Sequence, residues 1–588
     1  MRMMLARRAR HHLGNNSGYN GYVLNPRQVF LVATVFVFSS SAFAQQPVSA
    51  EHGMVASASR FASEVGVETL KRGGNAVDAA CAVGLALAVV YPEAGNIGGG
   101  GFMMVRLANG RSIAIDYRET APAAATRTMY LDAHGIVIPQ DSLVGYRASG
   151  VPGTVAGFAL AQRKYGKLKW RDVVEPARQL AFKGFKLSKA FASNVHRATN
   201  LAKFQESRRI FQNGGDYYKE GDLFRQPDLA DTLKRIEDKG PDEFYRGKTA
   251  QLIAGAMKGN GLITLKDLRN YRPVERKPVE GTYRGFGVIT MPPPSSGGIA
   301  VVEMLNMLEH FRLSEMKFDS ISSDHLLVEA MRRAFADRAE YLGDPDFVKI
   351  PQSGLIAKPY AQQMAMNIDL RKASLSSQVG HGNPIGYESS ETTHFSVVDK
   401  DGNAVSNTYT LNFGYGSGVT IPGAGFLMND EMDDFTSKPG VPNGFGLIQG
   451  ESNAIGPNRR PLSSMTPTFL VKDGKLFMVI GSPGGPTIIT TVLQVIVNVV
   501  DHGMNIAEAI AAPRLHHQWL PDQIQAETGS APDPVFAALV GMGHAFTKNA
   551  RQPRVAWGDA EGIVIDPKTG MRLGASDPRS SNAATIGY

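Results

Sequence analysis

Cysteine is almost absent from this chain of 588 residues, which contains only Cys81. A single cysteine excludes an intramolecular disulfide framework and any structural zinc site built from cysteines. The adjacent histidine pairs at 11–12 and 516–517 lack the spacing of metal ligands on a helix, and no H-E-x-x-H pattern occurs. The glycine run at 98–101 precedes an expected strand and lacks the lysine of a phosphate-binding loop. We therefore predict neither a metal nor a cofactor.

The chain also lacks a membrane-spanning hydrophobic run and a large excess of one charge. Residues 29–38 form an apolar run of ten residues, which is short for a bilayer span. Basic residues precede this run and an A-x-A pattern at Ala42 and Ala44 follows it, as is typical of a secretory signal peptide. We predict cleavage after Ala44 and a periplasmic or secreted protein; an uncleaved membrane anchor is the alternative.

The net charge is modest once this leader is set aside. Residues 1–44 contain five arginines and no lysine, aspartate or glutamate, so their removal lowers the formal net charge from +8 to +3. Such a small excess gives no electrostatic argument for nucleic-acid binding. Hydrophobic residues make up 43% and charged residues 20% of the chain, which is the composition of a globular protein and excludes disorder over its whole length.

Periodicity predicts a mixture of helices and hairpins. Helical spacing predicts four helices, at 61–72, 76–91, 299–311 and 487–500. Alternation around turn residues predicts three β-hairpins: 102–107 with 111–117, 394–399 with 403–412, and 468–480 about its central turn. Asn75 is expected to cap the second helix. Residues 150–350 are expected to be mainly helical, and residues 370–391 to form a flexible surface linker.

The end of that linker carries the first chemical hypothesis. The polar stretch stops at Glu391, directly before a strand that begins with Thr392. If the chain were cut between them, Thr392 would carry both a hydroxyl and a free α-amine. An α-amine has a pKa of about 8, so it could act as the base for the hydroxyl without a histidine. The alternative is that a β-branched residue heads a strand only because of its β-propensity.

Other patterns could bind a reacting group. Gly484 and Gly485 lie between an expected strand and helix, where backbone N–H groups could stabilise an oxyanion; a plain connection is the alternative. The hydroxyls of the Ser463-Ser464 pair could bind a carboxylate, and Asp433 or Asp434 could bind an ammonium. Residues of these types are more often helix caps or solvated loop residues.

In combination, these patterns resemble the γ-glutamyltranspeptidase family of N-terminal-nucleophile hydrolases over nearly all of residues 50–588. The motifs that carry the resemblance are spread along the chain: 73–80 (GGNAVDAA), 96–102 (NIGGGGF), 116–119 (DYRE), 152–157 (PGTVAG), 292–298 (PPPSSGG), 392–399 (TTHFSVVD), 429–435 (NDEMDDF), 460–465 (RPLSSM) and 481–485 (GSPGG). The resemblance implies an α/β fold of the α+β kind, a four-layer αββα sandwich. It also implies a precursor that cuts itself before Thr392 into a large subunit, 45–391, and a small subunit, 392–588, which share one core.

The resemblance further implies a role for each site residue. Thr392 Oγ attacks a γ-glutamyl amide such as that of glutathione, and Thr410 supports its position. Gly484 and Gly485 form the oxyanion hole. Arg118, with Ser463 and Ser464, holds the substrate α-carboxylate. Asp434, with Asn412 and Glu431, holds the α-ammonium. The resulting γ-glutamyl ester passes its acyl group to water or to an amino acid or peptide. Such a clamp rejects acyl groups that lack either charge.

One residue departs from the family pattern. Bacterial relatives with a lid over the site carry a tyrosine in a segment that matches 438–457, and the corresponding residue here is Phe445. The balance between hydrolysis and transfer is therefore left open. Two alternatives to the transpeptidase also remain, a cephalosporin (glutaryl) acylase of the same architecture and a non-catalytic exported binding protein.

Overall fold

A computed structural model of the chain describes residues 45–384, 395–552 and 557–588. The expected signal peptide, 1–44, and the expected cleavage site at Glu391 and Thr392 lie outside the described residues. Within the described ranges, no helix has both the length and the apolar character needed to cross a membrane.

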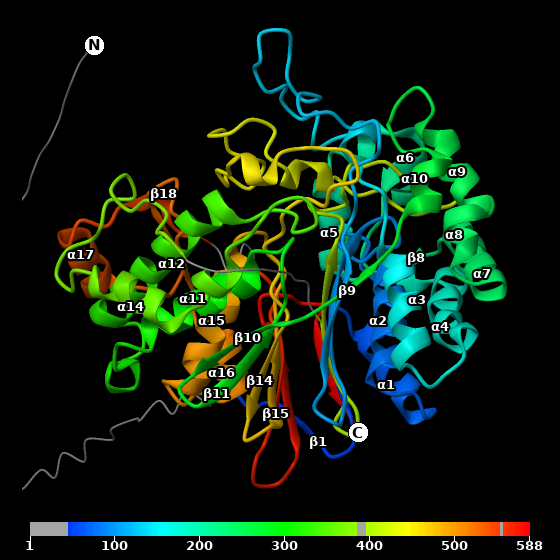
Figure 1. Cartoon of the computed structure of the whole chain (residues 1–588). Helices are drawn as coiled ribbons and strands as arrows, with labels where there is room; N and C mark the ends of the chain where they lie inside the picture. Colours follow the sequence, from blue (N-terminus) through cyan, green and yellow to red (C-terminus); the bar gives the residue numbers. More distant parts are fainter. Residues whose placement is uncertain (1–44, 385–394, 553–556) are drawn as a thin grey trace, which may run out of the picture. The chain divides into compact units, whose positions relative to one another are not determined.

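Two seven-stranded antiparallel sheets lie side by side in the centre of residues 45–588 (Figure 1). The first sheet contains, in spatial order, β1 (Val48–Ala50), β20 (Arg572–Ser576), β19 (Glu561–Ile565), β15 (Lys475–Ile480), β14 (Thr468–Lys472), β11 (Phe286–Thr290) and β10 (Val279–Tyr283). The second contains β21 (Ala584–Gly587), β2 (Met54–Ser57), β12 (Ser396–Val398), β13 (Ala404–Thr410), β3 (Gly100–Arg106), β4 (Ser112–Tyr117) and β9 (Val274–Arg276). Strand β12, which begins four residues after Thr392, is thus paired on both sides, with β2 and β13.

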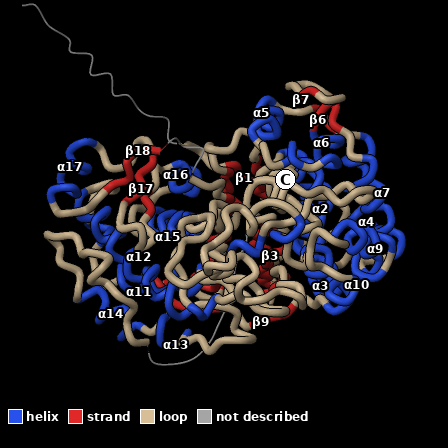
Figure 2. Tube along the Cα trace, turned by 90° about the horizontal axis from the view of Figure 1, so that it is seen from above, coloured by secondary structure: helices blue, strands red, loops and turns tan. Residues whose placement is uncertain are grey.

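Helices cover the outer face of each sheet and complete four layers, αββα, as predicted (Figures 1 and 2). The second sheet is covered by α1 (Arg60–Lys71), α2 (Ala76–Val90), α3 (Thr154–Tyr165) and α4 (Trp170–Lys183), with α7 (Pro227–Lys239) packed on α4. The first sheet is covered by α11 (Gly297–Leu308), α15 (Thr487–Val500) and α16 (Ile506–Ala511), with α12 (Ile321–Tyr341) and α14 (Lys358–Met366) packed on α11. A small sheet of β16 (Leu515–His516), β17 (Ile524–Glu527) and β18 (Phe546–Gln552) lies near α17 (Asp533–Gly541).

The hydrophobic core follows these layers. Phe102 and Met104 of the second sheet meet Phe469 and Val479 of the first in a cluster between the sheets. A second cluster lies between the second sheet and helices α1–α4, and a third between the first sheet and helices α11 and α15. Helix α2 is buried on every face, so Cys81 is a packing residue there, as its apolar sequence predicts.

The predicted hairpins and the cap of α2 are confirmed. Strands β3 with β4, β12 with β13, and β14 with β15 form the three antiparallel pairs. The Asn75 side chain accepts hydrogen bonds from Val77 N and Asp78 N, and Asp78 accepts one from Asn75 N, which completes a capping box.

Residues 150–350 are mainly helical, as predicted, but the short strands β9, β10 and β11 also lie within them. Strands of three to five residues give too short an alternation to stand out from a helical background. The described part of the expected linker, 370–384, has no helix or strand and is mostly exposed, as predicted, but it is hydrogen-bonded to neighbouring segments. Ser376 N donates a hydrogen bond to Asp522, and Trp519 Nε1 donates to the carbonyl oxygens of Ser376 and Val379. The polarity of a segment does not indicate whether it forms hydrogen bonds with residues that are distant in the sequence.

Candidate active site

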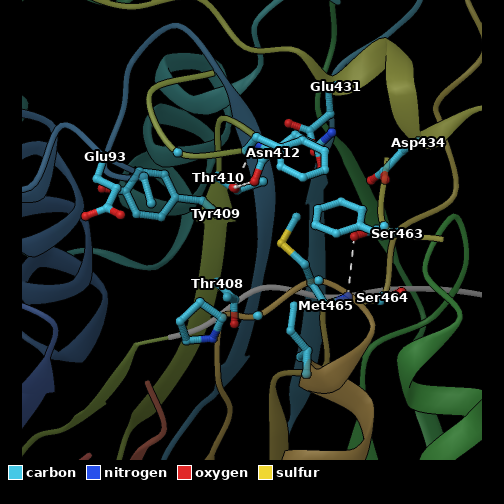
Figure 3. A pocket seen from close by; sticks show the side chains of 18 of the residues that line it. Glu93, Thr408, Tyr409, Thr410, Asn412, Glu431, Asp434, Ser463, Ser464 and Met465 are labelled. Atoms are coloured by element: carbon cyan, nitrogen blue, oxygen red, sulfur yellow. Dashed lines mark hydrogen bonds between the residues drawn. The ribbon is translucent and has the colours of Figure 1, made fainter. Parts of the chain in front are cut away.

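A cavity of about 290 Å³ lies where the end of β13 meets residues 431–434, 463–465 and the turn after β15 (Figure 3). Its lining comprises Tyr91, Glu93, Ala94, Thr408, Tyr409, Thr410, Asn412, Phe413, Gly414, Glu431, Asp434, Phe445, Ser463, Ser464, Met465, Pro483, Gly484, Gly485 and Ile488. Every site residue expected from the sequence and described in the structure is in this lining except Arg118, which lies behind it, and the alternative acid Asp433. Glu391 and Thr392 are outside the described residues.

Close backbone packing positions the end of β13. The Cβ of an alanine at Gly99 would lie 2.1 Å from the Thr410 carbonyl oxygen, so only glycine permits this approach. Asn96 Nδ2 donates to the same oxygen over 2.8 Å. The glycine run is therefore a packing device rather than a phosphate cradle. Thr410 Oγ1 accepts a hydrogen bond from Asn412 N over 2.9 Å, and Asn412 adopts a left-handed φ of 84°.

The turn at Gly484 and Gly485 presents two backbone donors. Both glycines have positive φ angles, 133° and 57°, which turn the chain sharply between β15 and α15. Among the described residues, neither N–H group donates a hydrogen bond. Helix α15 begins at Thr487, so its positive N-terminal end lies close to these donors. The turn can stabilise negative charge that develops in the cavity.

The Ser463 and Ser464 hydroxyls are held as donors toward the cavity. Ser463 Oγ accepts a hydrogen bond from Met465 N over 3.4 Å, the dashed line in Figure 3. Ser464 Oγ accepts one from the Arg338 guanidinium over 3.2 Å. A hydroxyl has one proton and two acceptor positions, and each of these oxygens already accepts from the protein. Their O–H groups are therefore available to a carboxylate in the cavity.

Arg118, which the resemblance assigns to the substrate α-carboxylate together with the two serines, is paired with two acids in the structure. Its two terminal nitrogens form hydrogen-bonded ion pairs with Glu431 and Asp434, and its side chain is fully buried. Its Nε donates to the Pro461 carbonyl oxygen over 3.2 Å. The guanidinium thus fixes two carboxylates at the cavity wall, because the fork of an arginine suits two acceptors.

This acidic end holds more carboxyl groups than one arginine can neutralise. Burial raises the pKa of Glu431 to about 7, although Arg118 opposes the shift. Burial, followed by the charge of Glu431, raises the pKa of Glu119 well above its usual range, and Glu119 lies 3.9 Å from Arg118. Burial also raises the pKa of Asp434. A cation entering the cavity would favour the ionised forms and relieve this repulsion.

Residues 438–457, which the resemblance predicts to be a lid and which we call the lid segment, contribute Phe445 to the cavity. The Phe445 ring stacks on Phe413, with centroids 4.2 Å apart and planes 12° apart. A Cβ at Gly485 would lie 2.7 Å from this ring, so the phenyl group covers that glycine. The segment is attached through Asp433, which accepts hydrogen bonds from Gly444 N and Ser142 Oγ.

Sequence reasoning missed three buried groups behind the cavity: Arg338, Gln449 and Glu119. Arg338 contacts Ser464 directly, and Gln449 Nε2 donates to the Asp434 carbonyl oxygen over 3.2 Å. Glu119 was visible within the 116–119 motif but received no role. Arg338 lies in α12, a helix rich in charged residues, and no local pattern distinguishes it from residues on a solvated face.

One group of potential metal ligands is present among the described residues, formed by His325, Glu329 and His544. The two imidazoles bond to each other, with His325 Nδ1 2.8 Å from His544 Nε2. Glu329 forms ion pairs with Arg332 and Arg333, which hold its pKa at about 2 against the effect of burial. Two guanidinium groups on the only anionic ligand disfavour a dication, so the group fits a structural network better. His516 and His517 are likewise bonded to protein groups, to Gln518 and Asp522.

Comparison with known proteins identifies related chains. The family model described as Gamma-glutamyltranspeptidase matches residues 62–587. The glutathione hydrolase proenzyme of Escherichia coli is 51% identical over 545 residues, which cover 92% of this chain and 93% of that protein. The γ-glutamyltranspeptidase structure from Helicobacter pylori is 46% identical with a TM-score of 0.55, covering 55% of this chain and 94% of its own. A cephalosporin acylase structure from Bacillus halodurans is 28% identical with a TM-score of 0.82, covering 95% and 99%.

Proposed function

The chain belongs to the γ-glutamyltranspeptidase family, and on that premise we propose that it transfers γ-glutamyl groups from glutathione and related amides to water, amino acids or peptides. The observation that carries the proposal is the cavity itself. Hydroxyl donors at Ser463 and Ser464, carboxylates at Glu431 and Asp434, and the unbonded N–H groups of the glycine turn surround one space. A γ-glutamyl group presents a carboxylate, an ammonium and a reacting carbonyl, which match these three sets.

The proposed reaction begins at Thr392. After self-cleavage, its α-amine takes the proton from its own hydroxyl as Oγ attacks the γ-carbonyl carbon. Gly484 and Gly485 donate to the oxyanion of the tetrahedral intermediate. The intermediate collapses with cleavage of the C–N bond, and the proton passes to the leaving amine. Water or an amine then attacks the γ-glutamyl ester, which restores the Thr392 hydroxyl.

Recognition of the acyl group divides between the two ends of the cavity. We assign the α-carboxylate to Arg118 with the Ser463 and Ser464 hydroxyls, and the α-ammonium to Asp434 with Glu431 and the Asn412 side chain. Arg118 also orients the two acids, because each of its terminal nitrogens pairs with one of them and still has a second N–H donor. An acyl group without the ammonium would leave these acids poorly compensated in a buried place.

This assignment of the two charged groups also argues against the acylase and the non-catalytic binding protein. The acylase relative shows that this fold also serves a cephalosporin acylase, but a glutaryl group offers no cation to Asp434 and Glu431. A non-catalytic binding protein is disfavoured, because the E. coli relative is a hydrolase proenzyme. We propose a precursor that is exported, loses residues 1–44 and cuts itself into subunits 45–391 and 392–588. The proenzyme name, and the solved chain that spans about half of this one, support processing into two subunits.

A denaturing gel combined with turnover of a γ-glutamyl anilide tests the proposal. The purified protein should give two bands, of roughly 38 and 21 kDa, and sequencing of the smaller one should begin at Thr392. Thr392→Ala should remain one chain without activity, whereas Thr392→Ser should retain partial cleavage. An intact single chain that turns over the anilide would contradict the mechanism.

A further inference from the structure

Arg338 is a buried cation without an acidic partner among the described residues. It lies in α12, and its residue is 2% exposed. No described carboxylate oxygen lies within 4.0 Å of its guanidinium nitrogens, whereas the neighbouring Arg332 and Arg333 both pair with Glu329. Burial lowers the pKa of Arg338 only to about 10, and the charge of Asp434 opposes the shift, so the group remains charged at neutral pH. A buried charge of this kind favours a counter-ion that arrives from outside.

The contacts of Arg338 converge on the hydroxyl end of the cavity. One terminal nitrogen donates to Ser464 Oγ over 3.2 Å, and Nε donates to Ser296 Oγ over 2.8 Å. Ser296 Oγ in turn donates to the Ser463 carbonyl oxygen over 2.7 Å. Because Ser296 gives its single proton to Ser463, its oxygen can only accept from Arg338. One guanidinium therefore anchors both serines. It bonds directly to the Ser464 hydroxyl, and it reaches the Ser463 backbone carbonyl through the Ser296 hydroxyl.

A third contact connects Arg338 with the opposite end of the cavity. Its other terminal nitrogen lies 3.5 Å from Gln449 Oε1, and Gln449 Nε2 donates to the Asp434 carbonyl oxygen. Asn453 Nδ2 donates to the same carbonyl over 2.7 Å. Arg338 thus lies between the lid segment and the two serines, and its charge is on the side of the cavity where the hydroxyl donors are.

We propose that Arg338 is a positioning residue for the substrate carboxylate, which it serves through Ser464 and Ser463 and by a positive charge that has no direct ion pair among the described residues. This inference rests on the proposed function and adds to it a source of carboxylate selectivity. Arg118 is paired with Glu431 and Asp434, so Arg338 adds at this end a positive charge that no described carboxylate pairs with directly. It holds the Ser464 oxygen as an acceptor, so that the hydroxyl proton points to the substrate.

Three anilides that share one leaving group test the proposal: γ-glutamyl anilide, 4-aminobutyryl anilide, which lacks the carboxylate, and glutaryl anilide, which lacks the ammonium. Arg338→Gln should lower kcat/KM for the γ-glutamyl and glutaryl compounds by about 10- to 100-fold, mainly through KM, because a hydrogen-bonded charge no longer supports the carboxylate. The 4-aminobutyryl compound should be unaffected or slightly improved. Arg338→Lys, which keeps the charge but not the fork, should lose less of the preference for carboxylate.

The matched control is Arg332→Gln, which removes another buried arginine of the same helix away from the cavity. It should change the three kcat/KM values by a common factor. An equal loss for all three compounds in both Arg338 variants would mean a merely structural role and would overturn the proposal. If Arg338→Gln does not fold, Arg338→Lys and the inhibition constants of glutamate, glutarate and 4-aminobutyrate give the same comparison. A wild-type preference for glutaryl anilide would contradict the proposed function but not Arg338, because that acyl group also carries the carboxylate.

Discussion

The rings of Phe413 and Phe445 stack almost parallel over the cavity, 4.2 Å apart. Phe413 follows Asn412 at the end of β13, whereas Phe445 belongs to the lid segment, so this contact joins the lid to the sheet. The lid is also held at Asp433 and by Gln518 Nε2, which lies 3.4 Å from the Phe445 carbonyl oxygen. An apolar stack thus occurs at the position where the resemblance predicts a tyrosine hydroxyl.

Replacement of Phe445 should change the ratio of hydrolysis to transfer. An aromatic pair contributes about 0.5–1.5 kcal/mol beyond its buried area, so Phe445→Ala should open the lid several-fold more often and raise the share of hydrolysis. Phe445→Tyr keeps the ring and adds a hydroxyl, so it should alter the ratio with little effect on folding. The products formed from a γ-glutamyl anilide, with and without an acceptor dipeptide, measure this ratio. Unchanged ratios and rates in both variants would show that position 445 does not control the lid.

The sequence predicted contacts between residues that are close together in the chain, but not contacts that depend on tertiary packing. Asn75 and the hairpin turns each act within a few positions, so their roles follow from spacing. The pairing of Arg118 with Glu431 and Asp434 depends on contacts with residues more than 300 positions away, which charge type alone could not predict. Identification of the site itself required the combination of motifs.

Helix α12 shows why Arg338 could not be found in this way. Its charged residues resemble those of a solvated helix, yet most of them are buried because they pair with one another or with neighbouring segments. Only the packed structure shows that Arg332 and Arg333 share Glu329 while Arg338 contacts hydroxyl groups instead. The strands β10 and β11 were not predicted for a related reason. An alternation of five residues is too short to indicate a strand until its pairing in a sheet is known.

Gly99 should not tolerate a side chain. A Cβ there would lie 2.1 Å from the Thr410 carbonyl oxygen and 2.8 Å from Asn96 Oδ1, so Gly99→Ala must displace the end of β13. We expect a loss of about 1–3 kcal/mol in unfolding free energy, as for other overpacked sites, and reduced self-cleavage. Gly255→Ala is the matched control, because its Cβ would meet no atom within 4 Å in the exposed part of α9 (Lys248–Met257). It should be neutral or slightly stabilising in urea unfolding, and equal effects of the two changes would contradict the packing argument.

Acidification should destabilise the protein through His516. Its Nδ1 lies 2.9 Å from Thr490 Oγ1 and its Nε2 lies 3.0 Å from Gln518 Oε1, and burial lowers its pKa from 6.5 to about 4. The unfolded chain binds a proton below pH 6.5 and the folded chain does not, so stability is complete above that pH and falls between 6.5 and 4. The loss from this residue should be about 2 kcal/mol at pH 5.

Urea unfolding of the uncut Thr392→Ala chain at pH 7.5, 6 and 5 measures this effect. His516→Gln should be less stable at pH 7.5 but should fall less steeply with pH, since glutamine does not titrate. Burial lowers the pKa of His544 to about 3 as well, so part of the slope should remain in the variant. Parallel curves for the two proteins would show that His516 is not a source of the pH dependence.

Asp434 decides between a transpeptidase and a glutaryl acylase. Its carboxylate pairs with Arg118 and lines the cavity, so we expect the substrate ammonium to bind beside it. Asp434→Ala would leave that ammonium poorly paired, at a cost of about 3–5 kcal/mol, or roughly two to four decades in kcat/KM for γ-glutamyl anilide. Asp434→Asn, which keeps the size but not the charge, should lose nearly as much, and glutaryl anilide should lose far less in both. Self-cleavage should survive, because Thr392 and the glycine turn are unchanged. An enzyme that prefers glutaryl anilide from the outset and is indifferent to both substitutions would be an acylase.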